Sequence, residues 1–100
     1  NLNIPLPLGT GDDGYLAAFE IAARTVHAFA PGALAVALGL DASEHDPLKG
    51  LAVTTDGFRR IGAALARLGL PTVLVQEGGY LSDILGTNLT ATLAGFEAAR

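Results

Sequence analysis

The stretch ALAVALGL, residues 33–40, decides the fold class of this chain. It is a continuous apolar run of strand length, and it lies between Pro31-Gly32 and the polar loop DASEHDPLKG. A run this short could also be part of a buried helix, but its flanking turn residues favour a strand buried on both faces, as in a parallel sheet. The stretch TVLVQ, residues 72–76, is predicted to be a second strand of the same kind.

A helix is predicted between the N-terminal loop and the first of these strands. Apolar residues recur at steps of three and four from Asp12 or Asp13 to about Phe29, which is the periodicity of a helix with one buried face. The two aspartates suit the start of this helix, where carboxylates can cap free N–H groups and face the positive end of the dipole.

Two more helices are predicted further along the chain. The second is capped by Thr54 or Thr55 and ends at Gly69, with Pro71 just beyond. The third runs from around Asp83 or later to the end of the chain. The inward-facing residues are expected to be Phe58, Ile61, Leu65 and Leu68 in the second helix, and Leu85, Leu89, Leu93 and Phe96 in the third.

The first residues of the chain, NLNIPLPL, contain Pro5 and Pro7, so they can form at most an edge or terminating strand. Strands that alternate with helices imply right-handed crossovers and a parallel sheet flanked by helices, which is the α/β class. Three strands make a poor sheet on their own. We therefore expect residues 1–100 to be the C-terminal part of a larger α/β domain whose N-terminal part is absent.

Composition narrows the classes of partner. Charged residues make up 16% of the chain, below the roughly one quarter typical of a soluble domain, so other polypeptide is expected to cover part of its surface, and a homo-oligomer is possible. The net charge of −4 and the absence of a basic cluster argue against nucleic acid. No apolar run reaches the roughly 18 residues of a membrane span. The lack of cysteine suits a reducing compartment, and we expect a cytoplasmic protein.

The loop before the first helix has the spacing G-x-G-x-x-G, formed by Gly9, Gly11 and Gly14. This spacing alone is weak evidence for a dinucleotide site. Asp12 and Asp13 stand where a pyrophosphate would lie and would repel it, and the preceding segment contains prolines. A turn that leads into a capped helix is the favoured interpretation, and binding of NAD or ATP would be needed to revive the nucleotide hypothesis.

In an open α/β sheet, ligands bind outside the carboxyl ends of the strands. Asp41 directly follows the first buried strand, and Tyr80 lies in the loop QEGGYLSD after the second. Asp41 could be a metal ligand or could merely cap the next turn. Tyr80 could donate a hydrogen bond to an oxyanion or could be a packed rim residue. Asp46, which precedes a proline, is predicted to form a turn.

Four stretches together resemble the zinc-dependent histone deacetylase and acetylpolyamine amidohydrolase family, which has the arginase/deacetylase α/β fold. These stretches are NIPLPLGTGDDGYLAAF, ALAVALGLDASEHDPLKGL, TTDGFRRIG and VLVQEGGYL, and they span nearly the whole chain. GDDGYLAAF and EGGY are more similar to class II-like bacterial amidohydrolases than to class I enzymes.

This resemblance implies a role for each matching residue. Asp41 corresponds to the second aspartate of an Asp/His/Asp zinc site, and Tyr80 to the tyrosine that polarises the scissile carbonyl. The implied reaction is zinc-dependent hydrolysis of an acetylated amine, such as an acetyl-lysine or acetylpolyamine, to acetate and free amine. Zinc activates the water, a histidine acts as base, and the tyrosine stabilises the oxyanion.

The resemblance also implies a narrow substrate channel. Gly78 and Gly79 correspond to glycines that line it, and Pro47 and Leu48 to residues near the zinc and at the channel wall. Some polyamine-specific members have a glutamate at the position of Leu48, so leucine does not support that specificity.

The family's paired histidines and its D-x-H zinc motif have no counterpart here, because neither His27 nor His45 matches them. His27, near the end of the first helix, suits a dipole or surface role, and His45 is a loop histidine. The segment alone is therefore expected to be inactive. A catalytically inactive family member that binds small ligands or acts as an interaction protein stays open as an alternative.

Overall fold

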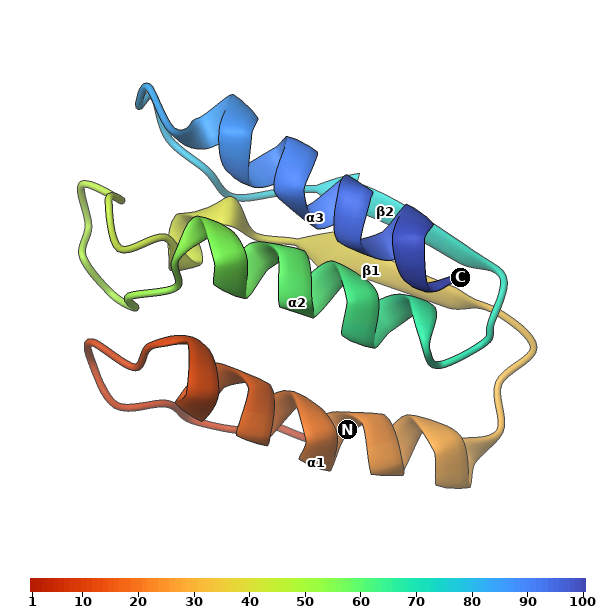
Figure 1. Ribbon diagram of the computed structural model, residues 1–100. Coiled ribbons are helices and arrows are strands. Elements are labelled where there is room, and N and C mark those ends of the chain that lie inside the picture. The colour runs from red at the N-terminus through yellow and green to blue at the C-terminus, as the bar shows by residue number, and fades with distance from the viewer.

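The computed structural model describes residues 1–100 as three helices, one short 3-10 turn and two strands (Figure 1). In chain order these are α1 (Asp12–Phe29), β1 (Leu34–Leu38), η1 (Leu40–Ala42), α2 (Thr55–Ala66), β2 (Thr72–Gln76) and α3 (Leu85–Ala99). The predicted α/β class and the positions of both predicted strands are confirmed. No helix combines the length and apolar character that crossing a membrane requires.

The two strands pair in parallel, with Leu34 opposite Thr72 and Leu38 opposite Gln76. Helices α2 and α3 lie side by side over one face of this sheet, and α1 runs alongside α2 (Figure 1). On the other face Val73 and Val75 are 55% and 48% exposed. The prediction that both faces are buried is therefore wrong for these residues, because no element within the 100 residues covers the second face.

The first eight residues form no strand. The segment is attached to the rest of the chain further on, where the Gly9 N–H donates to Gly50 O at 2.9 Å and the Ala52 N–H donates to Thr10 O at 2.9 Å. Pro5 and Pro7 have no N–H to donate to a ladder, which explains why even the expected edge strand does not form.

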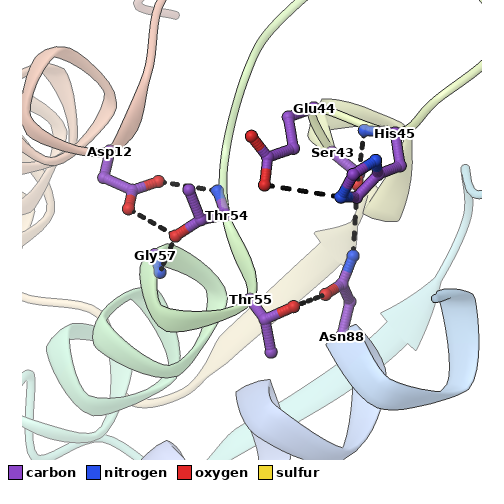
Figure 2. Close-up of polar contacts among 8 residues, drawn as sticks. All are labelled: Asp12, Ser43, Glu44, His45, Thr54, Thr55, Gly57 and Asn88. Carbon is purple, nitrogen blue, oxygen red and sulfur yellow. Dashed lines mark hydrogen bonds and ion pairs between the residues drawn. The ribbon is translucent and has the colours of Figure 1, made fainter.

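Helix α1 begins at Asp12, as predicted, but neither aspartate caps it, and Gly11 is the N-cap residue. The Asp12 carboxylate accepts hydrogen bonds from the Thr54 backbone N–H at 2.8 Å and the Thr54 hydroxyl at 2.6 Å (Figure 2). Thr54 in turn caps α2, because its hydroxyl oxygen accepts from the Gly57 N–H at 3.1 Å. The glycine loop thus directs Asp12 to the start of a second helix, which agrees with a turn leading into a helix.

The hydrophobic core lies between the sheet and helix α2, and its centre comprises Leu38, Leu40, Ala42, Val53, Phe58, Ile61 and Leu65. Helix α3 packs on α2 through small and polar residues, and its buried positions are Asn88, Ala91, Thr92 and Gly95. Leu93 is 44% exposed, so the prediction that it faces inward is wrong. The helices pack too closely for large side chains between them, so the leucines of α3 lie to the side of the contact.

Candidate active site at the carboxyl ends of the strands

The ends of β1 and β2 lie together, as expected for a parallel pair. The Glu77 N–H donates to Leu38 O at 3.1 Å, and the Leu40 N–H donates to Gly78 O at 2.9 Å. These bonds continue the pairing beyond the strands. They bring η1, which contains Asp41, against the loop that leads to Tyr80.

Asp41 lies between two glycines at this edge. A Cβ atom added to Gly39 would come within 2.7 Å of the Asp41 Oδ1 atom, and one added to Gly78 would collide with the whole carboxylate. Asp41 makes no side-chain hydrogen bond within the 100 residues, so it does not cap the following turn. Its carboxylate is held by packing against these two glycines, and its oxygens remain available as hydrogen-bond acceptors or metal ligands.

A pocket of about 440 Å³ opens beside Asp41. Its lining residues are Tyr15, Ala37, Gly39, Asp41, Ala42, Asp46, Leu48, Gly50 and Leu51. Tyr15 comes from α1. Burial raises the pKa of its hydroxyl above the usual 10.0, and the Asp41 carboxylate raises this pKa further. Tyr15 is therefore a neutral hydroxyl at neutral pH, available beside the carboxylate.

Tyr15 could not be singled out from the sequence, because in the sequence it is only one more position of an amphipathic helix. The weak signal was its place in the first turn of α1, because a helix that leads into a parallel strand runs back along it and starts near the strand's carboxyl end, where ligands bind.

Asp46 forms the predicted turn, in which the Leu48 N–H donates to the Asp46 Oδ2 atom at 2.8 Å. Asp46 is 4% exposed, and its other oxygen, Oδ1, is buried with no hydrogen-bond partner among the 100 residues. Buried carboxylate oxygens are normally paired.

The other predicted site residues lie around this edge at different depths. Gly79 has a φ of 128°, which only glycine adopts readily, and it packs on Leu40 and Leu85. Leu48 lines the pocket but is 72% exposed, and Pro47 is exposed. Tyr80 is 49% exposed and is not among the residues that line the pocket beside Asp41.

Neither histidine lines the pocket beside Asp41. His27 lies exposed in the last turn of α1, as its position predicts. The His45 ring pairs only with its neighbour Glu44, at 3.5 Å, on the surface (Figure 2).

A metal ion needs several ligands, and no group of three or more His, Cys, Asp or Glu side chains is placed to hold one. Asp41 fits the role of one such ligand, because it is a free carboxylate fixed in a glycine cradle at the end of a strand. The other ligands would have to come from outside these 100 residues.

The parallel strands, their helices and a carboxylate held at the strand ends define an α/β protein whose free carboxylate lies at the edge where such sheets bind ligands. Residues 1–96 match the family described as histone deacetylase domain, and the chain belongs to this family.

Individual relatives support this family assignment. The chain is 43% identical over 100 residues to an acetylpolyamine amidohydrolase of Burkholderia pseudomallei, and 38% identical over 99 residues to acetylpolyamine amidohydrolase 1 of Pseudomonas aeruginosa. These matches cover 100% and 99% of this chain. A crystal structure of acetylpolyamine aminohydrolase from B. pseudomallei superimposes with a TM-score of 0.95, at 43% identity, covering 100% of this chain and 29% of that one. The chain spans 29% of the length of both curated relatives.

Proposed function

We propose that the complete protein hydrolyses an acetylated amine and releases acetate and the free amine, with zinc as its cofactor. The observation that carries this proposal is the Asp41 carboxylate, which is free of hydrogen bonds and held between Gly39 and Gly78 at the strand ends. In a family of deacetylases and amidohydrolases, such a carboxylate is expected to bind a metal. We further propose that residues 1–100 form the C-terminal part of one deacetylase-like domain.

In this mechanism Asp41 would be one of the zinc ligands. When bound, the zinc would polarise the amide oxygen and activate a water molecule. Tyr80 donates a hydrogen bond to the oxygen of the tetrahedral intermediate as negative charge develops there. The C–N bond then breaks, the amine leaves with a proton that comes from the attacking water, and the acetyl carbon retains the oxygen of that water.

Gly78, Gly79, Pro47 and Leu48 would line the channel through which the acetylated amine reaches Asp41. The absence of a side chain at Gly78 keeps the approach to the carboxylate open. Leu48 gives the pocket an apolar, solvent-facing rim. Such a channel suits the linear methylene chain of acetyl-lysine or of an acetylpolyamine, and two relatives reported above are named as acetylpolyamine amidohydrolases.

The test is an acetate-release assay with the complete protein on acetyl-lysine peptides, acetylpolyamines and small acetylated metabolites. Tyr80→Phe should lower kcat about a hundredfold, the scale of losing one oxyanion donor. Asp41→Asn should remove bound zinc, measured by metal analysis. Asp13→Asn is the matched control, since that carboxylate is exposed and pairs only with Arg60.

Near-normal turnover in Tyr80→Phe would refute the role given to Tyr80, and an unchanged zinc content in Asp41→Asn would refute the ligand assignment. If the wild-type protein binds these compounds but releases no acetate, the catalytically inactive, ligand-binding alternative is correct.

A further inference from the structure

A buried polar network lies directly behind the turn that carries Asp41. The Asn88 side-chain N–H donates to the Ser43 hydroxyl oxygen at 3.2 Å, and the Thr55 hydroxyl donates to the Asn88 carbonyl oxygen at 2.7 Å. Asn88 is 1% exposed and Ser43 is 4% exposed. Figure 2 shows Asn88 reaching from α3 to both partners. One amide thus connects three elements that are far apart in the sequence.

The connection matters for Asp41 because Ser43 ends η1. The Ser43 N–H donates to Leu40 O at 3.3 Å, which closes the single turn that contains Asp41. The opposite end of this turn is fixed by the Leu40 N–H bond to Gly78 O at 2.9 Å. A turn of three residues has few hydrogen bonds of its own, so its orientation depends on such outside anchors.

The Ser43 anchor is costly to disturb. Its hydroxyl oxygen also accepts from the His45 N–H at 3.2 Å, and the Val53 N–H donates to Ala42 O at 2.9 Å beside it. Loss of the Asn88 donor would remove one of the two hydrogen bonds that this buried oxygen accepts, and with it the bond that ties the end of η1 to α3, so η1 would gain freedom to move. The movement available is a shift of η1 relative to α3, which would displace the Asp41 carboxylate.

We infer that Asn88 is a positioning residue for the metal site, acting through Ser43 to hold the turn that presents Asp41. This inference rests on the proposed function, in which Asp41 binds zinc. Asn88 touches neither the metal nor the substrate. It is buried on the helix-contact side of the molecule, and its effect is expected on metal affinity in addition to stability.

The experiment measures zinc affinity in the complete protein by competition with a chromophoric chelator, for Asn88→Asp, Ser43→Ala and the double variant. Asn88→Asp keeps the acceptor for Thr55 and deletes the donor to Ser43. Ser43→Ala removes the acceptor without adding a charge, so it also serves if Asn88→Asp folds poorly. Each single variant should lower zinc affinity about tenfold, as expected for a residue that orients a ligand. The zinc affinity of the double variant should be no lower than that of the single variant with the lower affinity, because both substitutions break the same hydrogen bond.

Leu89→Ala is the matched control, because Leu89 is the next residue of α3 and packs against the core without joining the network. It should lower the unfolding temperature and leave zinc affinity unchanged. If Asn88→Asp and Ser43→Ala behave like Leu89→Ala, the network is merely structural and the inference is wrong. If Asp41→Asn itself keeps its zinc, the proposed function fails instead, so the two failures are distinguishable.

Discussion

Asp41 owes its position to the absence of side chains around it. Gly39 and Gly78 come from different strand ends, and each leaves the space that the carboxylate occupies. The backbone bond from the Leu40 N–H to Gly78 O sets the distance between the two loops. A hydrogen bond to a neighbour would compete with a metal for the carboxylate oxygens, whereas packing against glycine leaves them free.

Gly78→Ala should therefore impair the site. The added methyl group would collide with the Asp41 carboxylate, and the φ of Gly78 is not in the left-handed region, so sterics alone are tested. We expect at least a tenfold loss of zinc affinity in the complete protein, the range seen when a ligand is misplaced. Gly86→Ala is the control, because a Cβ there meets nothing within 4 Å. Equal zinc affinity in the two variants would contradict the conclusion that Gly78 leaves the space that Asp41 needs.

At the scale of elements, the contact between α2 and α3 is set by two glycines that face the opposite backbone. A Cβ on Gly62 would meet the carbonyl of Thr92, and a Cβ on Gly95 would meet the carbonyl of Arg59. The two helices therefore touch backbone to backbone. This close contact brings Asn88 within hydrogen-bonding distance of Thr55 and Ser43.

Gly95→Ala should separate the helices and destabilise the protein by about 1–3 kcal/mol, the usual cost of overpacking. The measurement is urea unfolding followed by circular dichroism. Gly86→Ala, in the first turn of the same helix and facing open space, should be neutral or slightly stabilising, because alanine favours helix over glycine. A stability for Gly95→Ala equal to that of Gly86→Ala would show that α3 can move away at no cost.

The same contact shows how far sequence reasoning reaches. The bounds of α1, the start of α2 and the Thr54 cap were predictable, because helix periodicity and capping residues are local signals, whereas α2 ends at Ala66, before the predicted stop at Gly69. The buried face of α3 was not, because glycine, threonine and asparagine carry no hydrophobic signal, and the pattern of leucines pointed to Leu93 instead. Asp12 was likewise assigned to its own helix, since nothing local reveals a partner 42 residues away.

At the scale of the whole molecule, the proposed zinc site needs ligands from outside the 100 residues. Asp41 and Gly78 could be placed together from the rule that parallel strands end at one edge, and the structure shows them in contact. Tyr15 and Asn88 reach the neighbourhood of Asp41 through tertiary packing, which sequence spacing does not encode. The exposed valines of β2 and the unpaired oxygen of Asp46 both face places where the 100 residues offer no partner.

Zinc binding tests this incompleteness directly. The isolated 100-residue polypeptide offers only the carboxylates of Asp41 and Asp46 in this pocket and no group of three ligating side chains, which is too few to compete with water for zinc, an ion that takes four ligands in proteins. Calorimetric titration of zinc should therefore give the same weak, unsaturated heat for the polypeptide and for its Asp41→Asn variant. The complete protein should bind one zinc tightly and lose it on the same substitution. Saturable one-to-one binding by the isolated polypeptide that disappears in Asp41→Asn would mean that further ligands lie within these residues, and the assignment of the missing ligands to the rest of the protein would be wrong.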